Sequence, residues 1–197
     1  MRAASVCLAA FVLANAAFGQ GTVVPDAPEV RGPLTLSAAY DVARGHNSFY
    51  FAGKAIPPTI RVFPGNAINS KYVNNLPVHS NEMCALGPCL NHSNLHFHGL
   101  HVSPEKPQDD VLTMMAMPGE TLSCRVDIPS YAAPGLYWYH THPHGESAKQ
   151  DLDGMSGAII IDGSTATIQN FEECASASLS RVSAISRTKA SPLATNF

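Results

Sequence analysis

The sequence predicts an all-β fold, an antiparallel β-sandwich or barrel, and three observations support this. Short apolar segments follow a period of two. In residues 122–128 every even position is apolar and every odd position is polar, as in a half-buried strand. The 14 Gly and 15 Pro interrupt such segments at intervals typical of turns between short strands. No segment repeats its apolar residues with the spacing of a long helix.

The predicted strands are bounded by turn signals or by a change of pattern. The strongest turn signals are the Pro-Gly pairs at residues 64–65, 118–119 and 134–135. The expected strands cover residues 34–43, 59–63, 67–76, 94–102, 111–116, 122–128, 135–142 and 157–162. Short strands at this spacing are typical of a two-sheet sandwich.

The two ends of the chain differ in composition from the part between them. Residues 1–19 carry one charge, Arg2, then an apolar run and small residues, which is typical of a secretory signal peptide and too short for a membrane span. Residues 164–197 are rich in Ser, Ala and Thr and contain no Gly, so we expect a poorly structured or truncated tail. The sequence therefore predicts one domain over residues 20–163, in a protein exported to the periplasm or secreted.

The charge of the chain excludes two classes of partner. The sequence has 12 Lys and Arg against 15 Asp and Glu, a formal net charge of −3, and no cluster of basic residues. Nucleic acids and anionic membrane surfaces both attract clustered Lys and Arg. We therefore expect no nucleic-acid partner and no membrane partner.

Four cysteines follow the predicted signal peptide, and an even number in an exported protein favours disulfides. Cys84 and Cys89 flank a Gly-Pro turn signal, which favours a local disulfide between them. The pairing of Cys124 and Cys174 stays open. A zinc site formed by Cys84, Cys89 and His92 is a less favoured alternative, because structural zinc sites use tighter, paired spacings.

Histidines are concentrated in two short windows of the chain. Of nine His, four lie in residues 92–101 and three in residues 140–144. Each window contains a His-x-His pair inside a predicted strand, His96 with His98 and His140 with His142, and side chains at i and i+2 of a strand share a face. If the two strands are neighbours, four imidazoles converge, a donor set that suits copper, zinc, iron or nickel.

The sequence around these pairs is more specific than the pairs themselves. The segments His96–Val102 and Gly135–His142 resemble the first two copper motifs of the multicopper oxidases, a laccase-like family. The segments at 56–65, 74–77 and 153–161 resemble the same family, in its order and spacing. The resemblance covers residues 34–163 and is to the N-terminal, cupredoxin (plastocyanin-like) domain of that family. It implies a cupredoxin-like β-sandwich.

The resemblance also implies a role for each paired histidine. In this family a reducing substrate gives electrons to a type 1 copper, and a trinuclear copper cluster then reduces dioxygen to water. By the resemblance, His96 would bind the type 2 copper of that cluster. His98, His140 and His142 would bind the type 3 pair.

The remaining polar candidates are weaker. Asp109 and Asp110 occupy the region where the family often has an acidic residue, whose implied role is to donate protons to reduced oxygen; a solvated loop is the alternative. His101 and His144 are expected near the site or at the surface rather than as ligands. Ordinary surface positions are expected for His46, His79 and His92, and packing positions for Met114, Met115 and Met117.

Two departures from the family pattern limit what this chain is expected to do. A type 1 site needs a Cys thiolate with two His and usually an axial Met. The family's late motif has Cys between two His, whereas Thr141 lies between the histidines here, and no His-rich loop follows Cys124. We therefore expect no type 1 copper in this chain. It also offers only half of the histidines of the trinuclear cluster, so further cupredoxin domains or a partner chain would be needed to complete it.

The expected function is that of a copper-binding N-terminal domain of a multicopper oxidase. The complete protein would oxidise phenol-, amine- or metal-type substrates with dioxygen. Whether this chain alone is an enzyme stays open. The alternatives are a stand-alone copper-binding or carrier module and a non-functional truncated product.

Overall fold

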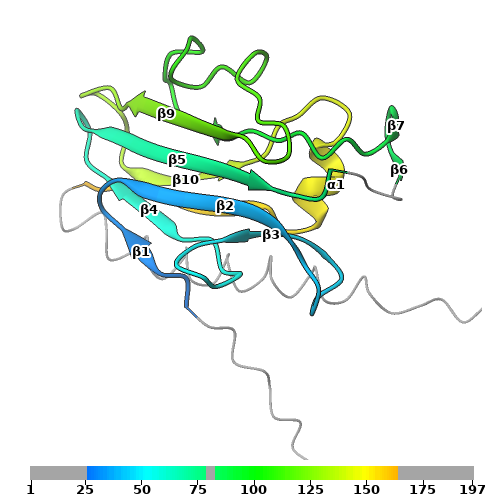
Figure 1. The fold of residues 1–197 in the computed structure, drawn as a ribbon. Helices are drawn as coiled ribbons and strands as arrows, with labels where there is room; N and C mark the ends of the chain where they lie inside the picture. Colours follow the sequence, from blue (N-terminus) through cyan, green and yellow to red (C-terminus); the bar gives the residue numbers. More distant parts are fainter. Residues whose placement is uncertain (1–25, 79–82, 164–197) are drawn as a thin grey trace, which may run out of the picture.

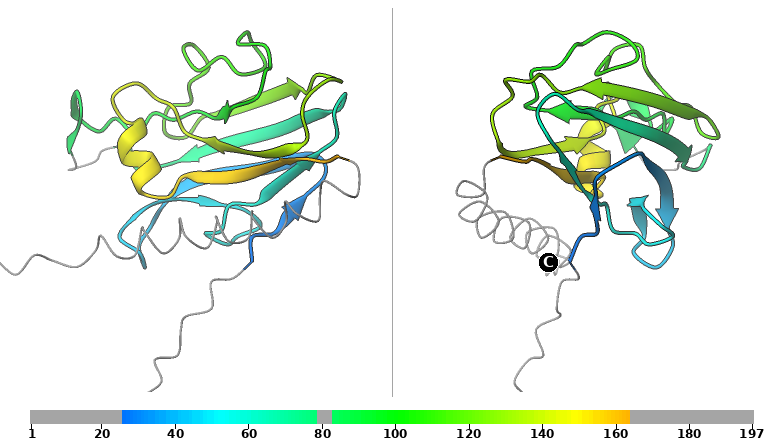
Figure 2. Two further views of the ribbon diagram at one scale, coloured as in Figure 1. Left: turned by 180° about the vertical axis from the view of Figure 1, so that it is seen from behind. Right: turned by 90° about the vertical axis from the view of Figure 1, so that its left-hand side faces the viewer.

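Two β-sheets packed face to face form the body of the molecule (Figures 1 and 2). The computed structural model describes residues 26–78 and 83–163. One sheet has the order β1 (Glu29–Val30), β4 (Thr59–Val62), β11 (Ser156–Ile161), β10 (Gly135–His140) and β8 (His96–His98). The other has the order β3 (His46–Tyr50), β2 (Leu34–Asp41), β5 (Ala67–Asn75) and β9 (Thr121–Asp127).

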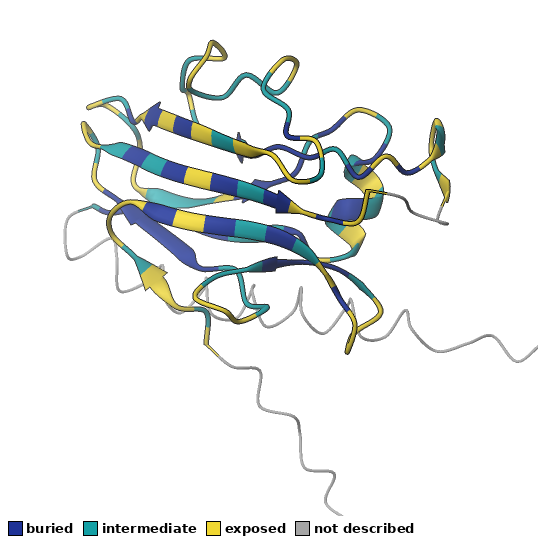
Figure 3. Ribbon diagram, viewed as in Figure 1, coloured by how far each residue is buried: buried dark blue, intermediate teal, exposed yellow. Residues whose placement is uncertain are grey.

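The period-two pattern of the sequence explains how the sheets pack. Alternate residues of β2 and β5 are buried, which Figure 3 shows as bands of colour along the strands. The buried side chains meet side chains from the opposite sheet in one core. The largest fully buried members of that core include Tyr72, Phe49, Phe97, Tyr139 and Ile159. Removing this apolar surface from water is the main stabilising contribution to the sandwich.

The predicted all-β sandwich is confirmed, but its sheets are mixed. The pairs β1–β4, β4–β11 and β2–β5 are parallel, whereas the other pairs within the two sheets are antiparallel. Parallel neighbours need a crossover connection rather than a tight turn. The long stretches of chain between these strands provide those crossovers.

The predicted strand at residues 111–116 is wrong, because local hydrogen bonds form a turn there. The Asp110 carboxylate accepts hydrogen bonds from the amides of Leu112 and Thr113 and from the Thr113 hydroxyl. An aspartate that binds nearby amides in this way competes with a strand ladder. Only Ala116 at the end of the segment makes a bridge, to Ser93.

The elements that were not predicted from the sequence include β3 and α1. Strand β3 has buried residues at three successive positions, Asn47 to Phe49, so it lacks the alternation that signals a half-buried strand. Helix α1 (Ser147–Leu152) has six residues, fewer than periodicity can reveal. Within the described ranges no helix is both long enough and apolar enough to cross a membrane.

A disulfide-closed hairpin lies at the same end of the sandwich as α1 (Figure 1). The hairpin consists of β6 (Met83–Cys84) and β7 (Gly87–Pro88), and the disulfide joins Cys84 to Cys89. The predicted local disulfide is therefore confirmed and the zinc alternative is wrong. Cys124 is a buried free thiol, and Cys174 lies outside the described residues. So do the predicted signal peptide, residues 1–19, and the predicted tail, residues 164–197.

Candidate metal centre

The two His-x-His segments lie side by side at one edge of the first sheet. Strand β8 is the edge strand and pairs antiparallel with β10. The register places His96 opposite His140 and His98 opposite Trp138. Residues opposite each other in an antiparallel pair point to the same face. This register therefore gathers three imidazoles and one indole on one side of the sheet.

The four paired imidazoles converge as the sequence predicts. The ring centroids of His96 lie 5.5 Å from His98, 5.2 Å from His140 and 5.2 Å from His142. His98, His140 and His96 each offer a ring nitrogen, and these atoms lie within 4.8 Å of one another. His140 Nε2 and His98 Nδ1 are 3.4 Å apart. Nitrogen atoms this close can share one metal ion or a pair of neighbouring ions.

His142 lies beyond the end of β10, so its position depends on a side chain and not on the strand ladder. Its backbone amide donates a hydrogen bond of 2.7 Å to Oδ1 of Asn94, which is itself buried. The Asn94 side-chain nitrogen donates in turn to the Val111 carbonyl. Asn94 was not predicted as a site residue. The sequence feature that could have identified Asn94 is its position two residues before His96, which in an extended chain puts both side chains on the same face.

Asp109 and Asp110 have different surroundings. The Asp109 carboxylate oxygens lie 2.9 and 3.1 Å from His96 Nδ1, and one of them accepts the Phe97 amide. Asp109 therefore fixes the His96 ring and leaves its Nε2 free for a ligand. Asp110 instead binds the turn that follows it, and its hydrogen bonds with Thr113 hold the pKa of the Asp110 carboxyl below its usual value.

A second carboxylate, which the sequence analysis did not identify, contacts His140. Asp151 of α1 places Oδ2 3.3 Å from His140 Nδ1, and the Thr141 carbonyl lies 2.9 Å from the same nitrogen. Burial lowers the pKa of His140, but its hydrogen bonds to the Asp151 carboxylate and the Thr141 carbonyl, with the negative charge of Asp151, outweigh it and leave that pKa above its ordinary value. No sequence motif marks Asp151, because only the docking of α1 brings it to β10.

The aromatic neighbour of the site is Trp138. Its ring stacks on His140 at a centroid distance of 4.1 Å and lies 4.9 Å from His98. Partial desolvation, followed by the nearby His140 and His96, lowers the pKa of the exposed His98. This shift favours the neutral ring, the form in which an imidazole binds a metal.

The other histidines lie at varying distances from the centre. His144 is exposed, with its ring centroid 5.9 Å from that of His142. His101 is exposed and has no ring contact with the four imidazoles in the part of the chain that is described. His46 is half-buried, with Nδ1 2.7 Å from the Asn47 carbonyl. His79 lies outside the described residues.

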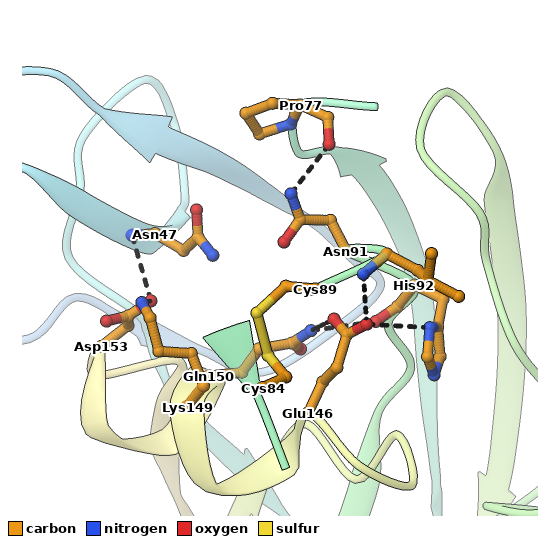
Figure 4. Close-up of a disulfide and its surroundings, with 11 residues drawn as sticks. Asn47, Pro77, Cys84, Cys89, Asn91, His92, Glu146, Lys149, Gln150 and Asp153 are labelled. Carbon is orange, nitrogen blue, oxygen red and sulfur yellow. Dashed lines mark hydrogen bonds and ion pairs between the residues drawn. A yellow bond between two sulfur atoms is a disulfide. The ribbon is translucent and has the colours of Figure 1, made fainter. Parts of the chain in front are cut away.

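The expected surface position of His92 is wrong, because this ring is mostly covered. Its Nδ1 lies 3.2 Å from the buried Glu146 carboxylate, which also accepts the Leu90 amide at 2.6 Å (Figure 4). Gln150 of α1 donates to the His92 carbonyl and accepts from the Ser93 hydroxyl. These contacts join α1 to the segment that leads into β8.

Of the three methionines near the site, Met114 packs against the core. Met115 is half-buried. Met117 is exposed, and its backbone amide donates to the Glu120 carboxylate. The packing interpretation is thus confirmed for Met114.

The profile of a protein family described as multicopper oxidase matches residues 37–166. The chain belongs to the multicopper oxidase family. Membership implies copper as the cofactor, and an all-imidazole donor set fits that metal. This family assignment agrees with the resemblance seen in the two His-x-His motifs.

Individual multicopper oxidases match the same part of the chain. The multicopper oxidase mco of Staphylococcus aureus is 27% identical over 116 residues, which cover 59% of this chain and 22% of that protein. Its counterpart from Staphylococcus haemolyticus is 26% identical over 118 residues, which cover 60% of this chain and 23% of that protein. The chain thus spans less than a quarter of the length of these relatives.

Solved structures of multicopper oxidases share the fold. A bacterial laccase-like multicopper oxidase, CueO from an Ochrobactrum species, superposes with a TM-score of 0.51 and 21% identity, over 73% of this chain and 30% of that one. McoA from Aquifex aeolicus gives a TM-score of 0.50 and 24% identity, over 71% and 30% of the two chains. The cupredoxin-like sandwich is confirmed by these comparisons.

Proposed function

We propose that His96, His98, His140 and His142 bind copper and form half of a trinuclear copper site. The observation that carries this proposal is the set of three ring nitrogens within 4.8 Å, presented by two adjacent strands. The strands present His96, His98 and His140 on one face, so the places of these three rings depend on the β8–β10 register, whereas His142 follows the end of β10.

The ligand side chains are held in orientations that suit metal binding. Carboxylates contact Nδ1 of His96 and Nδ1 of His140, which leaves Nε2 of each ring to face the centre. A carboxylate behind an imidazole fixes its tautomer and makes it a better ligand. We assign His96 to the type 2 position and His98, His140 and His142 to the type 3 pair, following the family motifs.

The rest of the copper site is proposed to come from further cupredoxin domains or from a partner chain. The site lies on the edge strand of its sheet, and Trp138 beside it is 39% exposed, so the centre is open on one side. The relatives are more than four times as long as the segment they share with this chain. A complementary surface that carries the missing imidazoles would close the centre.

The complete protein is proposed to be an exported oxidase that uses dioxygen as the electron acceptor. Bound copper would supply the one-electron steps that carry electrons from a phenol-, amine- or metal-type substrate to dioxygen. Asp109, between the His96 ring and the Phe97 amide, is the better placed of the two acidic residues to hold a proton near the centre. Asp110 is engaged in its own turn, so its role as a proton donor is the weaker proposal.

We also propose that this chain holds no type 1 copper. That site needs a thiolate. Burial raises the pKa of the Cys124 thiol to about 11, and the side chain points into the core of the sandwich. Cys84 and Cys89 are joined in the disulfide and have no free thiol.

A stand-alone copper-binding module is the second candidate, and one observation favours it. Three imidazole nitrogens of this chain lie within 4.8 Å of one another, and such a set would bind one copper ion before any partner arrives. Dioxygen uptake with a phenol or an aromatic amine separates the two functions. An oxidase domain needs its partner for uptake, whereas a carrier binds copper and never supports turnover.

Copper content of purified variants tests the ligand assignment. Replacing both His96 and His140 by Ala should abolish tight copper binding, because only one of the three converging nitrogens remains. His46→Ala is the matched control, since that histidine lies on β3 in the other sheet. Full copper content in the double variant would refute the proposed site. Intense blue absorbance from the copper-loaded chain would refute the absence of type 1 copper.

A further inference from the structure

We propose that His144 and His142 form a copper-entry site that captures copper ions from solvent and passes them to the centre. The inference rests on the proposed function, because it assumes that copper is the metal of the centre. It assigns a role to a fifth imidazole that lies outside the four paired histidines.

The spacing of the rings supports a shared ligand pair. The centroid of His144 lies 5.9 Å from that of His142, close to the 5.8 Å between His142 and His140 and the 5.5 Å between His98 and His140. The His142 ring in turn lies 5.2 Å from His96. Imidazoles therefore follow one another without a break from the exposed His144 to the buried His140.

His142 and His144, the two rings at the outer end, are held differently from His96 and His140. Carboxylates contact Nδ1 of His96 and of His140, whereas Nδ1 of His142 is buried without a hydrogen-bond partner in the described part of the chain. His144 makes no hydrogen bond or ion pair with the described residues. Among the described residues no group fixes the tautomer of either ring, so both would be able to take up a metal and release it.

The backbone beneath His144 is ordered by its own contacts. The Pro143 carbonyl accepts hydrogen bonds from the amides of Glu146 and Ser147, at 3.1 and 2.9 Å. Gly145 adopts a positive φ of 89°, and its Cα faces the Leu86 side chain of the disulfide hairpin. The loop therefore presents His144 at a fixed place next to His142.

The chemistry of the pair suits transient binding. Imidazole nitrogen is a good copper ligand, but two imidazoles bind an ion less tightly than the larger set of the centre. The free energy therefore falls when a captured ion moves from the outer pair to the centre. The pair would speed the loading of copper without changing how much copper is bound at equilibrium.

The single tryptophan offers a direct measure of loading. Trp138 is the only Trp in the chain and stacks on His140, so copper that arrives at the centre should quench its fluorescence. The experiment mixes the copper-free full chain with cupric ion in a stopped-flow instrument and records the rate and the final extent of quenching. Chelator competition on the same samples gives the equilibrium affinity.

His144→Ala should slow quenching measurably, because copper would then reach the centre without the outer pair, while final quenching and equilibrium affinity stay unchanged. His101→Ala is the matched control, because His101 is also exposed but has no ring contact with the four imidazoles among the described residues. An unchanged rate in His144→Ala would overturn the inference. So would an equal loss of affinity, because His144 would then be a ligand of the centre. If the unaltered chain shows no quenching and binds no copper, the proposed function itself fails.

Discussion

The inner and outer halves of the histidine cluster differ in how the protein holds them. In the inner half, His96 and His140 each have a carboxylate at Nδ1 and lie on paired strands. In the outer half, His142 and His144 follow the end of β10, and no described side chain holds their rings by a hydrogen bond. Under the proposed function, the inner half would hold copper with fixed rings, and the outer half would give copper access to it.

The largest expected effect comes from removing Asp109, the carboxylate that contacts an inner ligand at the shorter distance. Asp109→Ala should weaken copper binding by about 10- to 100-fold, because His96 loses the group that fixes its ring. Asp109→Asn should have a smaller effect, since the amide oxygen can still accept the Phe97 amide. Competition with a chelator of known affinity measures both variants. Equal binding by the alanine variant and the unaltered chain would remove the proposed difference between the two halves.

Asp151→Asn should have a smaller effect, because Asp151 Oδ2 is 3.3 Å from His140 Nδ1 and the Thr141 carbonyl still contacts that nitrogen. We expect about a tenfold or smaller loss of copper affinity at high pH.

The same substitution should also extend copper binding to lower pH, even though it weakens binding at high pH. Asp151 contributes to the raised pKa of His140. As the pH falls, His140 of the unaltered chain is therefore protonated at a higher pH than it would be without Asp151, and the proton competes with copper for the ring. In Asp151→Asn the pKa of His140 falls, and the midpoint of copper uptake should move to lower pH. Copper titrations at a series of pH values test this. A midpoint that moves to higher pH would contradict the proposed contact.

The smallest expected effect comes from Asp110→Asn. Asp110 hydrogen-bonds to its own turn and contacts none of the four imidazoles among the described residues, so copper affinity should stay the same. The cost should be limited to a few tenths of a kcal/mol in the free energy of unfolding, as for other surface substitutions. Thermal unfolding and copper competition on the same sample measure both quantities. A loss of affinity as large as that of Asp109→Ala would show that the two carboxylates act together.

The thiol of Cys124 provides a separate test of the core and of the proposal that this chain holds no type 1 copper. Burial keeps this thiol protonated up to a pKa of about 11, so alkylation at pH 8 should be very slow in the folded chain and rapid in denaturant. Mass spectrometry after exposure to iodoacetamide measures the difference. Rapid modification of the folded chain would mean that Cys124 is an accessible thiolate.

Much of the fold could be predicted from local patterns. The strands β2, β4, β5, β9 and β11 lie where alternation and turn signals indicate them, to within a few residues at each end. Strand β8 is shorter than predicted, because Gly99 takes a positive φ of 84° and turns the chain after His98. Alternation could not show β3, whose successive residues are buried from both sides.

The sequence by itself determined which side chains share a face of each strand at the candidate centre, whereas the pairing of the two strands came from the tertiary structure. A period of two puts His96 with His98, and His140 with Trp138, on one face of a strand, and this follows from backbone geometry alone. The family resemblance then identified copper as the metal these rings would bind.

Only the tertiary structure decided what surrounds those rings. Asp109 and Asp110 are neighbours in the chain, yet the path of one loop directs the first to His96 and the second to its own turn. The docking of α1 brings Asp151 to His140. Contacts of this kind depend on where distant segments pack, and no local period or propensity carries that information.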